Sequence, residues 1–291
     1  GGVGDKTTLI VAPIAAACGV PVAKMSGRGL GFTGGTVDKL EAIPGFRTAL
    51  APTEFLELVR RTGLSVIGQS AHIAAADKKL YAMRDVTATV DSIPLIASSI
   101  MSKKLASGSD AIVLDVKTGD GAFMERQEEA EALGRLMVRM GEAAGKRTIA
   151  VITDMNQPLG RAVGNSAEVI EAIDTLKGCG PEDITQLSLA LAGMMICAGG
   201  KAQSLAEGER MAQEALQSGA ALQKLSDFIA GQGGDCRILN DYSLLPQPAC
   251  CRQVLSAADG FVRRIAAKSI GMASQHAGAG RATKEEKIDL S

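Results

Sequence analysis

The sequence is poor in aromatic residues, and this scarcity narrows the classes of protein that it can encode. It contains no Trp, two Tyr and six Phe in 291 residues. Proteins that bind single-stranded nucleic acids stack the bases on aromatic side chains, and the scarcity of aromatic residues makes this class of protein a poor match. Charge of one sign is lacking as well, because 31 basic residues face 32 acidic ones. A nearly neutral chain is a poor counter-ion for phosphate backbones, so we expect no nucleic-acid partner.

Histidines, closely spaced cysteines and long apolar runs are also scarce. His72 and His276 are the only imidazoles, and none of the six cysteines forms a C-x-x-C pair. A zinc site of the usual spacing is therefore excluded, and we expect a structural role for the isolated His72. No apolar run reaches the ~18 residues of a membrane helix, and no secretory signal is visible. We expect a cytoplasmic protein with no membrane partner, in a reducing compartment.

The hydrophobic pattern predicts the fold class. Hydrophobic residues make up 46% of the chain, enough to fill a sizeable core. Buried strands are predicted at 21–25, 64–68, 111–116 and 148–152. Helices are predicted at 7–18, with a buried strand as the alternative there, and at 36–40, 54–61, 126–144, 166–176, 183–197 and, as two helices, 205–229. Strands that alternate with helices favour an α/β fold with a mostly parallel sheet flanked by helices.

The segment 74–106 differs from its surroundings because its pattern is helical throughout, with a break near Pro94. We predict that it is part of a small helical domain. Residues 1–73 and 107–291 then form the α/β domain, which we expect to bind phosphate. The helical lobe is predicted to pack apart from the sheet domain and to close over it.

Two glycine-rich segments are candidates for anion binding. The first, Gly1-Gly-Val-Gly-Asp-Lys-Thr-Thr8, is not a Walker A loop because Asp5 separates Gly4 from Lys6. Its amides, at the start of a helix, suit an anion, and a plain glycine turn is the alternative. The second runs from Ser26 to Thr36 and contains a G-x-G-x-x-G match at 29–34, followed by Glu54. That match permits a dinucleotide-binding oxidoreductase, or a purely structural loop.

The residues around the second glycine segment favour a free phosphate over a dinucleotide. Ser26, Arg28, Thr33 and Thr36 add hydroxyl groups and a guanidinium to the loop, whereas a dinucleotide fingerprint usually has small or apolar residues there. Thr36 is also a candidate cap for the helix that follows.

The segment 74–106 carries a second group of candidate ligands. Ser99 and Lys103 are four residues apart, so they share one face of a helix. Together with Arg84 they could bind a planar ring that carries carbonyl groups. Lys104 points elsewhere on the same helix, and we expect it to be a solvated surface charge, which is also the alternative for Lys103.

Several motifs resemble the pyrimidine-nucleoside phosphorylase and thymidine phosphorylase family. The block Ser26-Gly-Arg-Gly-Leu-Gly-Phe-Thr-Gly-Gly-Thr-Val-Asp-Lys-Leu-Glu41 resembles the family signature over its whole length. The start of the chain resembles the second half of the family's Lys-His-Ser-Thr-Gly-Gly-Val-Gly-Asp loop. The resemblance continues through the segments 76–85, 91–95, 115–119 and 155–160, and so covers essentially the whole chain.

The resemblance implies a set of site residues. Phosphate would be bound by Thr8, Lys24, Met25, Ser26 and Thr36. The pyrimidine base would be bound by Arg84, Ser99 and Lys103, with Tyr81 nearby, and Arg84 and Lys103 would be the catalytic pair. The resemblance further implies a monovalent cation, K⁺. Its ligands, mostly backbone oxygens, would come from Gly4, Lys6, Leu159, Ala162 and Glu171.

The resemblance also implies the reaction and the assembly. The expected activity is the reversible phosphorolysis of pyrimidine nucleosides (uridine, thymidine, deoxyuridine) to the free base and (deoxy)ribose 1-phosphate, by a homodimer without an organic cofactor. The sequence does not decide between uridine and thymidine. A phosphoribosyltransferase of the related anthranilate type is the alternative.

The beginning of the chain departs from the family pattern. The Lys-His-Ser that precedes Gly-Gly-Val-Gly-Asp in the family is absent before Gly1. The loss of one charge-stabilising donor typically costs roughly 10²–10³ in rate. We therefore expect these 291 residues alone to be nearly inactive, and a non-catalytic binding protein is a third alternative.

Overall fold

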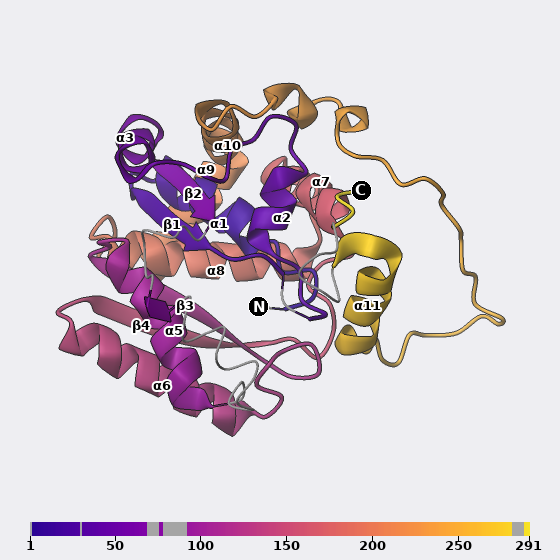
Figure 1. Ribbon diagram of the computed structural model, residues 1–291, viewed down its shortest axis with the longest axis horizontal. Coiled ribbons are helices and arrows are strands. Elements are labelled where there is room, and N and C mark those ends of the chain that lie inside the picture. Colours follow the sequence, from indigo (N-terminus) through magenta and orange to yellow (C-terminus); the bar gives the residue numbers. More distant parts are fainter. Residues whose placement is uncertain (1, 30, 69–75, 78–91, 281–287) are drawn as a thin grey trace.

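The computed structural model describes residues 2–29, 31–68, 76–77, 92–280 and 288–291 (Figure 1). Three residues discussed above, His72, Tyr81 and Arg84, lie outside the described residues. The predictions made for them therefore stay predictions.

A buried helix forms the centre of the larger hydrophobic core. Helix α1, Thr7–Ala17, buries every residue from Leu9 to Ala16. A helix that is apolar all round needs neighbours on every side. Helices α7, α8, α9 and α10 and strands β1 and β2 all contact α1. This packing fixes the position of the glycine loop at residues 2–6, which leads directly into α1.

The strands form two parallel pairs. Strand β1, Val22–Ser26, pairs with β2, Leu64–Gly68, and strand β3, Ala111–Thr118, pairs with β4, Arg147–Asp154. The parallel direction that the sequence predicts is confirmed. Within the described residues, however, the strands make two separate two-stranded sheets instead of one continuous sheet.

The helices follow the predicted order, and most of their bounds lie within two residues of the prediction. Beyond α1 they are α2 Thr36–Glu41, α3 Pro52–Thr62, α5 Ile93–Ala106, α6 Gln127–Ala143, α7 Asn165–Leu176, α8 Glu182–Ala198, α9 Leu205–Gln217, α10 Ala220–Gly231 and α11 Ala267–Ser274. Short turns of other helix types follow at Cys236–Leu239, Tyr242–Leu244 and Gln275–Ala279. Helix α2 has Gly35 at its cap and Thr36 as its first residue, so the predicted capping role of Thr36 is wrong.

Helix α8 lies between the two strand pairs (Figure 1) and contacts both α1 and β3. On the far side of β3, helices α5 and α6 cover the second sheet. Ala97 and Met101 of α5 belong to a separate hydrophobic cluster with residues of β3 and α6. The described part of the segment 74–106 therefore packs on the second sheet, and the division into domains stays a prediction.

The carboxyl ends of the strands mark the candidate site. Strands β1, β2, β3 and β4 end at Ser26, Gly68, Thr118 and Asp154. The loop after β1 is the glycine segment, and the loop after β4 leads to Leu159 and Ala162. In α/β folds with parallel sheets, ligands bind outside the carboxyl ends of the strands. Of the predicted site residues, Ser26 stands at the end of β1, and Leu159 and Ala162 lie in the loop after β4.

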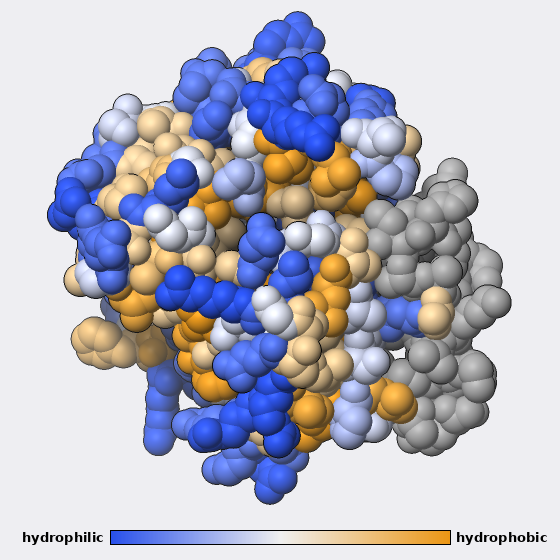
Figure 2. Space-filling model, turned by 90° about the vertical axis from the view of Figure 1, so that its left-hand side faces the viewer, coloured by the Kyte–Doolittle hydropathy of each residue, from blue (hydrophilic) through white to orange (hydrophobic). Residues whose placement is uncertain are grey.

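The surface combines polar and apolar areas. Hydrophilic side chains cover the top and bottom of one face of the molecule, and apolar ones show between them (Figure 2). The segment 246–266 runs in an extended arc away from the body (Figure 1), and it exposes Val254, Leu255, Phe261 and Val262. None of the helices in the described part of the chain is long and apolar enough to cross a membrane.

Candidate active site

A buried lysine connects the first glycine loop to the loop after β4. The side chain of Lys6 is fully enclosed, and its ammonium donates to the carbonyl oxygens of Leu159 (3.0 Å) and Ala162 (3.1 Å). The same ammonium donates to Oε2 of Glu171 on α7. An ammonium has three N–H donors, so Lys6 is fully paired by these three acceptors.

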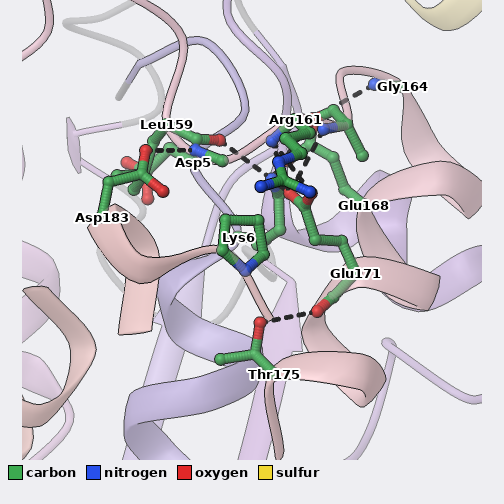
Figure 3. A network of polar contacts seen from close by, with 12 residues as sticks. Asp5, Lys6, Leu159, Arg161, Gly164, Glu168, Glu171, Thr175 and Asp183 are labelled. Carbon is green, nitrogen blue, oxygen red and sulfur yellow. Dashed lines mark hydrogen bonds and ion pairs between the residues drawn. The ribbon is translucent and has the colours of Figure 1, made fainter. Parts of the chain in front are cut away.

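The carboxylate of Glu171 is held from the other side by main-chain amides. The Arg161 N–H donates to Oε1 at 2.9 Å and to Oε2 at 3.2 Å, and the Ala162 N–H donates to Oε2 at 3.2 Å. Figure 3 shows this carboxylate reaching from α7 into the loop that carries Leu159 and Arg161. The loop 159–162 therefore wraps around a buried ion pair.

Two glycines allow the backbone to approach this ion pair. Gly4 and Gly160 both have positive φ, at 69° and 72°. A Cβ at Gly160 would lie 2.3 Å from Oε2 of Glu171 and 3.0 Å from Nζ of Lys6. A Cβ at Gly4 would lie 2.5 Å from the Leu159 oxygen. A side chain at either position would need the space that the ion pair and its carbonyl ligands occupy.

All five residues predicted to bind a monovalent cation are thus brought together. Their chemistry differs from the prediction in one respect: the Lys6 ammonium itself takes the two carbonyls and the carboxylate. The residues present therefore do not fit a free K⁺ ion while Lys6 is in this position.

A second buried network joins the glycine loop to β1 and β3. The Lys24 ammonium donates to the Thr8 hydroxyl. Burial lowers the pKa of Lys24, while the charges of Asp5 and Asp115 act in the opposite direction. Burial alone would raise the pKa of Asp5, but the charge of Lys117 and a hydrogen bond from Thr7 hold it well below its ordinary value. Asp5 is therefore negatively charged at neutral pH.

The segment 26–36 folds back on itself at the carboxyl end of β1. The Val37 N–H donates to the Gly27 oxygen at 3.3 Å, which holds the start of α2 beside the end of β1. A Cβ at Gly35 would lie 2.1 Å from the Gly29 nitrogen, so the two arms of the loop touch. Ser26 and Thr36 stand at the two ends of this loop and are both partly exposed.

Arg28 does not bind an anion in this arrangement. Its guanidinium pairs with Asp38 (2.8 Å) and with both oxygens of Glu41 (2.6 and 2.8 Å). These hydrogen bonds raise the pKa of Arg28, with Glu41 as the main cause. Its donors fasten the loop to α2, and the suitability of this loop for phosphate stays a prediction.

The side chain of Met25 lies away from those of its neighbours Lys24 and Ser26, which are also predicted to bind phosphate. Its side chain is buried in a hydrophobic cluster with Phe55, Leu58 and Ile67. Alternation along β1 sends the Met25 side chain away from the face that Lys24 and Ser26 share. Only the main chain of Met25 is left to contact a ligand.

The two residues of α5 that are predicted to bind the base lie side by side, as helical spacing predicts; their role as base ligands stays a prediction. The Lys103 ammonium donates to the Ser99 hydroxyl at 3.0 Å and to Oδ2 of Asp77 at 2.9 Å. Ser99 is buried, and the Lys103 side chain is 18% exposed. Within the described residues, two of the three ammonium donors of Lys103 are occupied, by Asp77 and Ser99.

Lys104 is not a solvated surface charge, so that prediction is wrong. It is partly buried, and its pKa is lowered to about 7 by burial and by the charges of Lys24 and Lys103. Helix α5 contacts β1, and this contact brings Lys104 toward Lys24. The structure thus places three ammonium groups from two elements near one another.

Two further buried lysines escaped the sequence analysis. Lys117 pairs with Asp115 at 2.6 Å, and Lys39 pairs with Glu168 at 3.2 Å. A signal for the first existed, because Asp115 and Lys117 lie two residues apart on one face of a buried strand. Glu54, the acid that could have bound a ribose in a dinucleotide site, instead pairs with Arg47 at 2.6 Å on the surface.

Comparison with known proteins identifies the class of this fold and site. The model of the glycosyl transferase family a/b domain matches residues 1–222, and the model of the pyrimidine nucleoside phosphorylase C-terminal domain matches residues 261–291. The molecule is therefore built on a glycosyl transferase α/β domain.

The most similar relatives define the family more closely. The chain is 58% identical over 290 residues to the pyrimidine-nucleoside phosphorylase of Bacillus subtilis (strain 168), and 56% identical over 290 residues to that of Geobacillus stearothermophilus. Both alignments cover 100% of this chain and 67% of the relative. The chain belongs to the pyrimidine-nucleoside phosphorylase family, and it spans about two thirds of the length of these relatives.

A solved structure supports the fold independently. The anthranilate phosphoribosyltransferase of Thermus thermophilus matches with a TM-score of 0.58 and 24% identity, over 80% of this chain and 74% of that one. At this identity the match establishes the α/β fold alone.

Proposed function

We propose that this site catalyses the phosphorolysis of pyrimidine nucleosides to the free base and a pentose 1-phosphate. The relatives described above are named pyrimidine-nucleoside phosphorylases. The proposal extends that activity to this chain, on the basis of the residues at its strand ends.

The grouping of Lys24, Lys103 and Lys104 is the observation that carries this proposal. Like charges near one another repel, and here the repulsion and burial bring the pKa of Lys104 to about 7. A bound anion relieves that repulsion, so the grouping favours a ligand with negative charge. Ser26, Thr36 and the amides of the glycine loops add neutral donors at the carboxyl end of β1.

The site has to bind phosphate in the position from which it can attack the sugar. The nucleophile must be held below the sugar, in line with the bond to the base, before the bond breaks. Lys24 and Ser26 are fixed by the parallel pairing of β1 with β2, and Thr8 is fixed by the start of α1. These rigid elements support the anion without requiring the loops to reorganise.

The base-binding group acts on the leaving group. Negative charge develops on the pyrimidine as the glycosidic bond breaks, and donors placed where charge develops lower the barrier. Ser99 and Lys103 present such donors from α5. Arg84, which lies outside the described residues, is proposed as their partner, with Tyr81 beside it.

A phosphoribosyl transfer is the second candidate, because the sequence leaves it open as the alternative within enzymes. The two candidates differ in the anion that they bind. Phosphate alone should raise the melting temperature of a phosphorylase. Phosphoribosyl pyrophosphate with Mg²⁺ should do so for the transferase, and NAD should have no effect on either.

The assembly and the location of the protein are part of the same proposal. The resemblance implies a homodimer. All six cysteines are free in the structure, which is consistent with the proposed cytoplasmic location. Sedimentation of the purified protein tests the first of these expectations.

Replacement of Lys103 provides the direct test of the base-binding role. Lys103→Ala should lower kcat/KM for uridine by roughly 10²–10³, because a charge-stabilising donor is lost. Lys201→Ala is the matched control, because Lys201 is exposed. The assay measures phosphate-dependent release of uracil by the chain extended N-terminally through Lys-His-Ser-Thr, the residues expected to complete its first glycine loop. A Lys103→Ala variant with near wild-type kcat/KM would refute the assignment.

A further inference from the structure

We infer that the Lys6 ammonium is a built-in cation that takes the place of an exchangeable monovalent metal ion in the loop 159–162. The inference concerns the buried ion pair and does not depend on the proposed function. It starts from the acceptors that surround Lys6, which are two backbone carbonyls and one carboxylate.

The surroundings of the ammonium have the chemistry of a site for a monovalent cation. Backbone carbonyl oxygens are the groups that replace water around K⁺ in protein sites, and a carboxylate supplies the balancing charge. Here the carbonyls of Leu159 and Ala162, from a single loop, and the carboxylate of Glu171 all accept from one ammonium. Such convergence of main-chain oxygens is repulsive unless a positive charge lies between them.

The walls of this site consist of backbone. Gly4 and Gly160 lie where any Cβ would collide with the ligands of the ammonium. The main chain is therefore shaped around a compact cation, and the long stem of Lys6 delivers that cation from the start of α1. Because the charge is tethered, it cannot be lost by dilution.

The position of Lys6 gives this cation a structural task. It ties the glycine loop that precedes α1 to the loop after β4 and to α7, segments separated by more than 150 residues in sequence. A hydrogen bond from the Leu159 N–H to the Val3 oxygen, at 3.0 Å, joins the same two loops. The geometry of the first glycine loop thus depends on a charge that the chain supplies itself.

The test replaces the ammonium by a smaller neutral group and then offers a free cation. We expect the melting temperature of the wild type to be the same in KCl, NaCl and choline chloride at equal ionic strength. Lys6→Thr should melt roughly 10 °C lower in choline chloride, because Glu171 is left as an unpaired buried charge. Added KCl should restore roughly half of that loss with a saturable dependence on concentration.

Two control variants separate this effect from general effects of salt. Lys6→Met fills the space of the lysine stem but supplies neither a cation nor room for one, so K⁺ should not restore its stability. Lys39→Thr removes another buried lysine, which pairs with Glu168 and, among the described residues, has a single carbonyl partner, the Asp5 oxygen at 3.3 Å. Its loss of stability should not respond to K⁺ more than to choline.

Some results would overturn the inference. One is a wild-type melting temperature that rises saturably with K⁺ but not with choline. Another is a folded Lys6→Thr variant whose stability is the same in all three salts. If Lys6→Thr does not fold, wild-type crystals soaked in Rb⁺ decide the matter. Absence of an anomalous peak between Leu159, Ala162 and Glu171 supports the inference, and a peak there with Lys6 displaced contradicts it.

Discussion

A single methyl group at Gly160 probes the buried ion pair more finely than removal of a charge. In Gly160→Ala, the new Cβ would lie 2.3 Å from Oε2 of Glu171 and 3.0 Å from Nζ of Lys6. The carboxylate cannot simply turn aside, because Lys6 and the amides of Arg161 and Ala162 hold it. Relief of the collision therefore separates the ion pair.

The magnitude follows from two contributions. Alanine at the positive φ of Gly160 costs about 1–2 kcal/mol, and disruption of a buried ion pair costs about 3–5 kcal/mol. Gly160→Ala should therefore lose roughly 4 kcal/mol or more of the free energy of unfolding. Gly178 is the matched control, because it has φ 81° but no atom within 4 Å of its Cβ position. Gly178→Ala should lose only the first contribution, about 1–2 kcal/mol.

Urea denaturation of both variants, followed by circular dichroism, measures these free energies. The comparison is informative because both substitutions have the same backbone strain and differ only in what the methyl group meets. Equal losses for the two variants would mean that the ion pair adapts freely, and the account of a rigid, tethered cation would be refuted.

Two other predictions concern the core and the anion site. Gln232 is fully buried, and its side-chain amide bonds to the N–H and the C=O of Val66, both at 3.0 Å. Gln232→Leu should lower the free energy of unfolding by about 1–3 kcal/mol per polar group left unpaired, and unchanged stability in urea would contradict this. Lys104, whose pKa is about 7, is mostly neutral above that pH in the free protein. Anion binding favours its charged form, so the affinity for sulfate should fall as pH rises above 7, by up to about tenfold per pH unit, and Lys104→Met should remove that slope in calorimetry.

The elements of the fold could be predicted from sequence because their signals are local. The strands at β3 and β4 are continuous apolar runs, and Pro and Gly punctuate the helices around them. Helix α3 shows the limit of such signals, because the predicted helix began at Glu54, whereas α3 begins at Pro52. Proline suits that position, since its fixed φ is already helical.

The sequence predicts which residues belong to the site but not all the contacts that they make. The pair of Ser99 and Lys103 followed from helical spacing and is confirmed by a hydrogen bond. The resemblance grouped Lys6 with Leu159, Ala162 and Glu171 but expected mostly backbone oxygens around a free cation, so it missed that the Lys6 ammonium itself takes these acceptors. The partial burial of Lys104 was missed because it arises from the contact of α5 with β1.

The central claim is that this site transfers a pentose from a pyrimidine to phosphate. Phosphorus NMR of uridine, phosphate and the chain extended through Lys-His-Ser-Thr tests it most directly, because the method identifies the phosphorylated product. We predict a pentose 1-phosphate signal that grows together with free uracil and vanishes when phosphate is omitted. Release of uracil without phosphate, or folded protein that forms no pentose 1-phosphate at all, would contradict the claim.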